Sequence, residues 1–292
     1  MDIAPMCSIF LANTGSTIPL RRSSSANNTH NKTNPPRRKS NYSLLIDGKN
    51  KRKKWRPPEL EDQTWFPNWL RAYQVAFLST LDRITRLYLP VHKRLEDLSP
   101  KRIVDLASGS GESAMNATAA LRKSGTSVLL TDKFPSISES NEEGHNIVEL
   151  DVLKSELPAA DLYIMFNAFH HFDSQERALI AKKASRNSSQ FLIIEPLRPR
   201  IDVFLKVFPA TFIGPFLLAP FMRPFSIKWL LLTYVIPLGV LATAWDGLAS
   251  VVKSLSREEW DDLEKELIST ERTVEQGLLT SRMAKLKYFL VK

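Results

Sequence analysis

The chain has 292 residues, 43% of them apolar, which is enough for one large buried core or two small ones. Its formal charge of +9 lies in the N-terminal part, because residues 1–58 hold twelve Lys/Arg and two Asp, leaving 28 basic and 29 acidic residues elsewhere. A near-neutral remainder argues against nucleic-acid binding by the folded part. Cys7 is the only cysteine, which excludes a disulfide framework and a thiolate metal site.

Residues 1–57 are rich in Ser, Asn and basic side chains and lack an apolar period, which predicts a disordered tail. Several interpretations stay open: a solvated tail without an address, a transit peptide, or a nuclear or anionic-lipid signal in "KNKRKKWR". Asp2 counts against a transit peptide. Residues 1–20 lack the basic start of a secretory signal, so we expect a cytoplasmic or organellar protein that is not secreted.

Residues 58–292 are predicted to form one domain of alternating helices and strands. Beyond Glu59 the composition changes, and apolar residues at three- and four-residue spacing over residues 65–98 predict a helix broken near Pro90. Strands are predicted at 102–107, 127–132, 146–151, 160–167 and 189–196, with helices at 112–125 and 174–185. This alternation predicts a parallel sheet with helices on both faces, a Rossmann-like doubly wound fold.

The C-terminal part predicts one more helix and a closing pair of strands. Ser256 and Glu259 form a capping box that opens a helix over residues 257–267. Residues 284–292 read as a strand, which we expect to pair with the segment 271–279.

The first predicted strand runs into a turn of small residues. Gly109, Gly111 and Ala114 satisfy the dinucleotide pattern G-x-G-x-x-A, and Asp132 ends the next strand, where a ribose-binding carboxylate belongs. Asp105 distinguishes between cofactors, because a carboxylate four residues before Gly109 would repel a pyrophosphate and attract an ammonium or sulfonium group. The pattern therefore favours a cationic sulfur cofactor.

The run "VDLASGSG" resembles motif I of the class I S-adenosylmethionine-dependent methyltransferases, usually D/E-x-G-x-G-x-G, with Ala107 in place of the first glycine. The resemblance implies a seven-stranded sheet and S-adenosyl-L-methionine as cofactor. It implies that Asp151, after the third strand, contacts the adenine amino group; a helix N-cap is the alternative for this residue. The implied cofactor residues are Asp105, Ala107, Ser108, Gly109, Gly111, Asp132, Lys133, Asp151, Val152 and Asn167.

A narrower resemblance covers residues 59–292. The motifs "EDQTWFPNWLR", "LTDKFP", "FNAFHHF", "PFMRPF" and "WDGLASVVKSLSREE" are similar to a group of largely uncharacterised bacterial-type class I methyltransferases. In that group the turn reads more like D-L-C-S-G-G-G-G-P, so Glu112 and Ser113 depart from its pattern at the methionine end of the cofactor.

Residues 200–250 are predicted to form an apolar insertion. The stretches 207–222 and 229–245 carry no charge, but prolines interrupt both and neither reaches the length of a spanning helix. We expect a cap over the acceptor site, which implies a small-molecule or lipid-like acceptor with an apolar body. Two alternatives are a peripheral membrane contact through residues 201–245 and a simple extension of the core.

Methyl transfer from a sulfonium depends mainly on alignment and exclusion of water, and a base is needed only where the acceptor must lose a proton. His170, His171 and Asn167 follow the fourth strand, where the resemblance places the transferred methyl group, and we expect at most one of the histidines to be catalytic. Glu195 and Asp246 are weaker candidates. The histidines and acids show no metal-ligand spacing, so we expect no metal.

Two other functions compete with a methyltransferase. One is an NAD(P)-dependent oxidoreductase, against which Asp105, the closing strand pair and the missing Tyr-x-x-x-Lys relay all argue. The other is a methyltransferase-like protein that binds a cofactor or partner without turnover.

Overall fold

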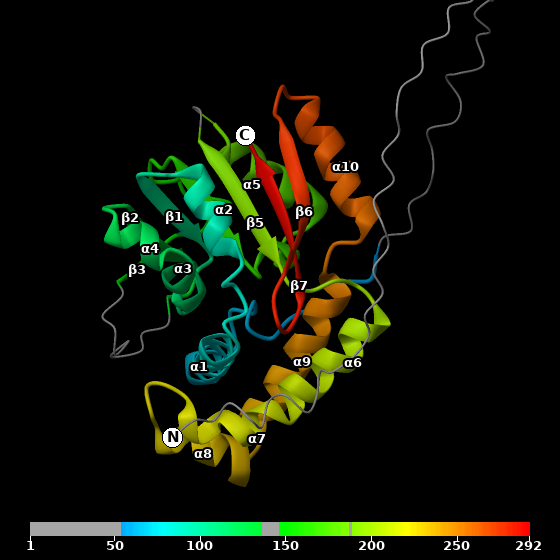
Figure 1. Cartoon of the computed structure of the whole chain (residues 1–292). Coiled ribbons are helices and arrows are strands. Elements are labelled where there is room, and N and C mark those ends of the chain that lie inside the picture. The colour runs from blue at the N-terminus through cyan, green and yellow to red at the C-terminus, as the bar shows by residue number, and fades with distance from the viewer. Residues whose placement is uncertain (1–53, 136–145, 187–188) are drawn as a thin grey trace, which may run out of the picture. The chain divides into compact units, whose positions relative to one another are not determined.

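Seven strands form one mixed sheet in the computed structural model, which describes residues 54–135, 146–186 and 189–292. Their order across the sheet is β3-β2-β1-β4-β5-β7-β6 (Figure 1). All neighbours are parallel except β7, which runs antiparallel to both β5 and β6. The strands are β1 (Arg102–Leu106), β2 (Ser127–Asp132), β3 (Ile147–Glu149), β4 (Leu162–Phe166), β5 (Gln190–Glu195), β6 (Val274–Thr280) and β7 (Lys285–Val291).

Helices bury both faces of this sheet. On one face, α5 (Ser174–Ala184) and α10 (Arg257–Ile268) pack on the strands, with Trp260 stacked on Phe169. On the other face lie α2 (Val91–Leu98), α3 (Glu112–Ala117) and α4 (Ala119–Lys123). Because both faces are covered, β4 is buried along its whole length, as its uninterrupted apolar sequence requires. The predicted doubly wound fold class is confirmed.

The parallel strands bring their carboxyl ends to one edge. The order reverses between β1 and β4, since β2 and β3 lie on one side of β1 and β4 and β5 on the other. In open α/β sheets, ligands bind in the crevice outside the carboxyl ends at such a switch point. The fold thus positions whatever follows β1 and β4 as the ligand-binding edge.

A second group of helices lies beyond the carboxyl end of β5, together with α1 (Asn68–Thr85) (Figure 1). α6 packs along α9, which also contacts α1. The group consists of α6 (Ile201–Phe212), α7 (Gly214–Leu218), η3 (Ala219–Phe221), α8 (Ile227–Leu230), η4 (Leu231–Val235) and α9 (Leu238–Lys253).

Two predicted helices differ from the structure. The first helix begins at Asn68 rather than Trp65, because residues 64–65 form a turn and Pro67 is the N-cap. The predicted helix 112–125 is divided at Thr118, whose hydroxyl donates to the carbonyl of Ala114 and so competes with the helical ladder. The predicted break near Pro90, the capping box of α10 and the closing strand pair are confirmed.

Candidate active site

The turn after β1 requires three residues with left-handed backbone. Ala107, Gly109 and Gly111 have φ of 59°, 58° and 77°. At Gly111 a Cβ would collide with the side chain of Leu130, whereas at Gly109 it would meet no heavy atom within 4 Å. Ala107 accepts a backbone strain of about 1–2 kcal/mol that glycine avoids, which is the physical reason for a glycine in the usual motif.

Asp132 at the end of β2 holds this turn in place. Its Oδ2 accepts from the Gly109 N–H at 2.8 Å and its Oδ1 from the Phe134 N–H at 2.8 Å. Ser108 joins β1 to β2 by donating its N–H to the Thr131 carbonyl. A carboxylate has about four lone-pair sites, so Asp132 can still accept two further hydrogen bonds, as a ribose diol would require.

Two buried oxygen atoms at the switch point have no hydrogen-bond partner among the described residues. They are Oδ1 of Asp105, which is 2% exposed, and Oδ1 of Asn167, whose φ of 49° is also left-handed. Burial, with a smaller contribution from the Asp132 charge, raises the pKa of Asp105 to about 8. Unpaired buried oxygens are costly, so their placement at the ligand-binding edge indicates a ligand that donates hydrogen bonds or carries positive charge.

Asp151 follows β3, where its side chain stabilises a turn. Its Oδ1 accepts from the Leu153 N–H at 3.0 Å, and its Oδ2 lies 3.8 Å from the ammonium groups of Lys133 and Lys154. Only a turn follows Asp151 before β4, so this contact is not the helix N-cap that the sequence offered as the alternative, and the adenine contact stays a prediction. The side chain of Val152 is buried in the core, which leaves its backbone N–H as the group that can face a cofactor.

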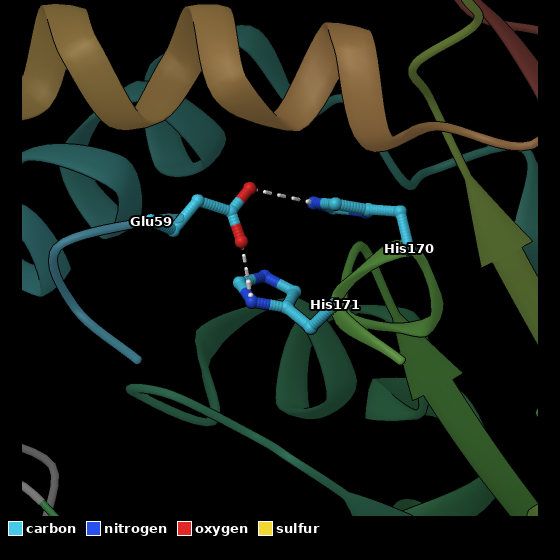
Figure 2. A group of neighbouring side chains, drawn as sticks. All are labelled: Glu59, His170 and His171. Atoms are coloured by element: carbon cyan, nitrogen blue, oxygen red, sulfur yellow. Dashed lines mark ion pairs between the residues drawn. The ribbon is translucent and has the colours of Figure 1, made fainter. Parts of the chain in front are cut away.

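The two histidines of η2 (Phe169–His171) have different surroundings (Figure 2). His170 is fully buried, with Nδ1 3.0 Å from Oε2 of Glu195 and Nε2 3.7 Å from Oε1 of Glu59. His171 Nδ1 lies 2.7 Å from Oε2 of Glu59 and 2.9 Å from Oδ1 of Asp62. Burial alone would lower the pKa of His171, but these two carboxylates outweigh it and hold that pKa well above its usual value. His171 is therefore an imidazolium at neutral pH.

Glu59 is the centre of this cluster, and no pattern in the sequence marks it. It is fully buried and also accepts from the Ser250 hydroxyl at 2.6 Å and from the Lys253 ammonium at 2.5 Å, both on α9. Burial would raise the pKa of Glu59, but His171, His170 and Lys253 overcome this and keep it well below its usual value. Glu59 is thus an ionised carboxylate that joins the loop after β4 to α9.

The segment around Glu59 is fixed by further long-range contacts. The Arg56 guanidinium donates to the carbonyls of His170 at 2.6 Å and Phe172 at 2.8 Å. Asp246 accepts from the N–H groups of Leu60 and Glu61 at 2.6 and 3.1 Å. Residues 56–62, which we call the strap, therefore connect η2 with α9.

Comparisons with known proteins bear on this arrangement. A scan against protein-family models and a search of curated proteins each found no match. Solved structures do match. The structure of human N-acetylserotonin methyltransferase with SAM matches at 15% identity and TM-score 0.49. The match covers 76% of this chain and 56% of that enzyme. An O-methyltransferase family 2 protein from Planctomyces limnophilus with apigenin matches at 15% identity and TM-score 0.47, over 76% of this chain and 61% of that one. The plantazolicin methyltransferase BpumL with SAH matches at 13% identity and TM-score 0.45, over 77% and 96%.

The strand order decides the fold. The seven-stranded sheet, the small-residue turn after β1 and the carboxylates near the ends of β1 and β2 are what the motif resemblance implied, and the structure adds that β7 runs antiparallel between β5 and β6. The chain has the class I methyltransferase fold. Sequence identities of at most 15% to these three structures support the fold only, and not a shared substrate or activity.

The methyltransferase fold brings the predicted cofactor residues to one edge. The turn from Asp105 to Gly111 meets Asp132 through hydrogen bonds, and Asn167 follows the adjacent strand. Asp151 follows β3 on the far side of β2. The two weaker candidates are structural in their contacts: Glu195 binds the backbone N–H and Nδ1 of His170, and Asp246 holds the strap.

Glu59, His170 and His171 offer the ligand types of a metal site, with ligand atoms within 4.8 Å of one another. The Lys253 ammonium already pairs with Glu59, and the imidazolium of His171 occupies the same carboxylate oxygen. In this cluster the Glu59 carboxylate is therefore paired with two positively charged side chains, and its charge is already neutralised without a metal ion. The absence of a metal stays a prediction.

Proposed function

We propose that the protein is an S-adenosylmethionine-dependent methyltransferase acting on a small, substantially apolar or lipid-like acceptor. The observation that carries the proposal is the pair of unpartnered buried oxygens, Asp105 Oδ1 and Asn167 Oδ1, at the β1/β4 switch point beside Asp132. The residues present fit this cofactor, because an ammonium would pair with Asp105 and a ribose diol would find the spare lone pairs of Asp132.

When bound, S-adenosylmethionine would supply a methyl group activated on a sulfonium, which leaves S-adenosylhomocysteine after transfer. Asp105 would bind the ammonium of the methionine end, and Asp132 the ribose. Asp151, the backbone of Val152 and Lys133 are the proposed neighbours of the adenine. Asn167 would orient the methionine end and the acceptor, since it follows β4, the strand that pairs with β1 at the switch point.

The acceptor side would be formed by the loop after β4 and the apolar helices α6–α9. α9 contacts η2 and packs next to the strap, so the helical insertion lies beside the histidines. Its apolar content supports an acceptor with an apolar body. A peripheral membrane contact through residues 201–245 belongs to the same proposal, because a membrane would supply such acceptors.

The histidines differ in what they can do for the acceptor. His171 is held protonated and cannot accept a proton, so it can only orient or stabilise negative charge. His170 Nε2 has no hydrogen-bond partner among the described residues, while Glu195 fixes its other nitrogen. If the acceptor must lose a proton, His170 is the proposed base. His170→Gln should then reduce turnover by about a hundredfold or more, with S-adenosylhomocysteine binding retained.

Calorimetric titration tests the proposal against its alternatives. We expect S-adenosylhomocysteine to bind with a Kd on the order of micromolar or below, and NADH not to bind. The reverse result would establish the NAD(P)-dependent oxidoreductase. Cofactor binding without turnover against a library of lipid extracts and small hydroxylated aromatics would support the methyltransferase-like binding protein.

The raised pKa of Asp105 predicts that cofactor binding depends on pH. Below about pH 8 the carboxyl carries a proton in the unliganded protein, and this proton must leave before an ammonium can pair with it. The affinity for S-adenosylhomocysteine should therefore weaken as the pH falls, approaching tenfold per unit below about pH 8. Calorimetry in buffers of different ionisation enthalpy should show proton release, and a flat profile would contradict the assignment.

Removal of the Asp132 carboxylate should weaken binding without unfolding the domain. In Asp132→Ala the ribose loses its acceptor and the Gly109 turn loses a hydrogen bond, so the Kd should rise by about tenfold to a hundredfold. Thermal unfolding would confirm that the fold is retained. Unchanged affinity in a folded variant would refute the ribose assignment.

A further inference from the structure

The helices α6–α9 expose an unusual amount of apolar surface. Of the 26 large apolar side chains that are exposed among the described residues, sixteen lie between residues 201 and 245. Soluble proteins rarely expose large contiguous apolar patches unless another molecule covers them. These sixteen residues, the apolar face, are Ile201, Leu205, Phe208, Phe212, Ile213, Leu217, Phe221, Phe225, Ile227, Leu231, Tyr234, Val235, Ile236, Leu238, Leu241 and Trp245.

The exposed residues follow helical periodicity. On α6, Ile201, Leu205, Phe208 and Phe212 are spaced by four, three and four residues, so they form one stripe along the helix. On α9, Leu238, Leu241 and Trp245 repeat at three and four residues. Since α6 packs along α9, both helices use another side for this contact and leave these stripes exposed. The residues between the stripes, in α7 to η4, continue the apolar face.

Beyond Asp202 in the first turn of α6, the charge along residues 203–245 has a single sign. No Asp or Glu occurs between Asp202 and Asp246, and the only charged residues there are Lys206, Arg223 and Lys228, all exposed. An apolar face bordered by basic side chains complements the anionic headgroups and acyl chains of a bilayer. If a second protein covered this face, acidic residues along its border would be tolerated, so their absence favours an anionic membrane.

Length and bends argue for lying on a membrane rather than crossing it. Among the described residues no single helix is long and apolar enough to span a bilayer. Two helix pairs reach that length and composition only together, and they bend by 43° between α6 and α7 with η3, and by 78° between η4 and α9. An amphipathic helix that lies in the interface buries its apolar side among the headgroups and acyl chains.

We infer that the apolar face of α6–α9 is a monotopic docking surface for an anionic lipid bilayer. The C-terminal part of α9 carries Ser250 and Lys253, which bind Glu59 beside η2, and Trp245 of the apolar face donates its Nε1–H to the Pro58 carbonyl of the strap. α9 therefore connects the docked surface to the loop that carries the histidines. That the acceptor is taken from the lipid phase is a consequence that rests on the proposed methyl transfer.

Co-sedimentation with vesicles tests the docking surface on the full chain. The full chain should pellet with vesicles of phosphatidylcholine and phosphatidylglycerol, and about 0.5 M NaCl should leave much of it bound, because salt screens the basic tail and not the apolar contact. The triple variant Leu217→Gln, Ile227→Gln and Val235→Gln removes three of the most exposed apolar side chains and should lower the partition coefficient at high salt by about a hundredfold or more.

A matched control replaces three exposed apolar residues elsewhere on the surface, Leu179→Gln, Ile268→Gln and Leu278→Gln, and should bind vesicles as the unmodified protein does. Thermal unfolding of all three proteins reports folding, and S-adenosylhomocysteine titration reports the proposed cofactor site, so that failure of either is distinguished from a loss of docking. A full chain that stays in the supernatant at high salt, or equal loss in both variants, overturns the inference. So does a dimer in sedimentation velocity that the first variant dissociates, because a second copy would then cover the face.

Discussion

Asp105→Asn should weaken S-adenosylhomocysteine binding by about a hundredfold or more while making the unliganded protein more stable. The affinity falls because the ammonium would face a neutral amide in a buried site, and removing one partner of a buried charge pair costs about 2–5 kcal/mol. Calorimetry measures the affinity and urea unfolding the stability. Opposite signs in the two measurements are expected for a residue that serves ligand binding at the expense of the fold.

The stability gain has a definite pH dependence. Burial raises the pKa of Asp105 to about 8, so the folded protein binds a proton more tightly there than the unfolded chain does. This group therefore destabilises the fold progressively as the pH rises from about 4 to about 8, and Asp105→Asn removes that trend. Asp97→Asn, at an exposed position on α2, is the matched control and should change neither quantity. A variant of Asp105 that binds the cofactor normally would remove the main support for the proposed function.

Glu59→Gln should lower the free energy of unfolding by about 3–5 kcal/mol. The substitution removes the fully buried one of the two carboxylates that Lys253 and His171 share, and leaves them only the half-exposed Asp62. Breaking a buried ion pair from one side costs about that much. Because the pKa of Glu59 is lowered by folding, its contribution is complete above the unfolded pKa near 4 and is lost as the pH falls further. The difference from the unmodified protein should therefore shrink below about pH 4.

The neighbouring glutamate provides a control of opposite character. Burial, together with the charges of Asp246, Glu59 and Asp62, raises the pKa of Glu61 to about 8, although the nearby His171 acts in the opposite direction, so its neutral form is favoured in the folded protein. A glutamine resembles that neutral form, and Glu61→Gln should change the free energy of unfolding by no more than about 1 kcal/mol at pH 7. Equal losses in the two variants would mean that the strap, rather than the charge of Glu59, carries the stabilisation.

The edge of the sheet could be predicted from the sequence because its signals are local. Asp105, Gly109 and Gly111 lie within one turn whose backbone demands are visible in seven residues, and Asp132 ends an apolar strand. The helices and strands of residues 91–195 could likewise be predicted, because their apolar periodicity is visible within short stretches of sequence. The capping box of α10 is local in the same sense, since Ser256 and Glu259 satisfy each other's backbone.

The charged cluster could not be predicted because it is made by the tertiary fold. Glu59 stands in a segment without helical or strand period, and its partners come from η2 and α9. A lone glutamate in such a segment looks like a solvated loop residue, and only the packing of α9 against the strap reveals that it is buried. The same limit explains why His170 and His171 look equivalent in sequence, although one is paired with Glu195 and the other with Glu59 and Asp62.

The contacts of Arg56 set a limit on how far the polypeptide can be shortened. Its guanidinium donates to the carbonyls of three successive residues after β4, His170, His171 and Phe172, and no side chain later in the strap makes these hydrogen bonds. A version that starts at residue 56 keeps these bonds and is the sensible one to crystallise or label. Trimming a single residue more would loosen the loop that carries both histidines, and a resulting loss of the proposed methyl transfer would then be mistaken for a role of the tail.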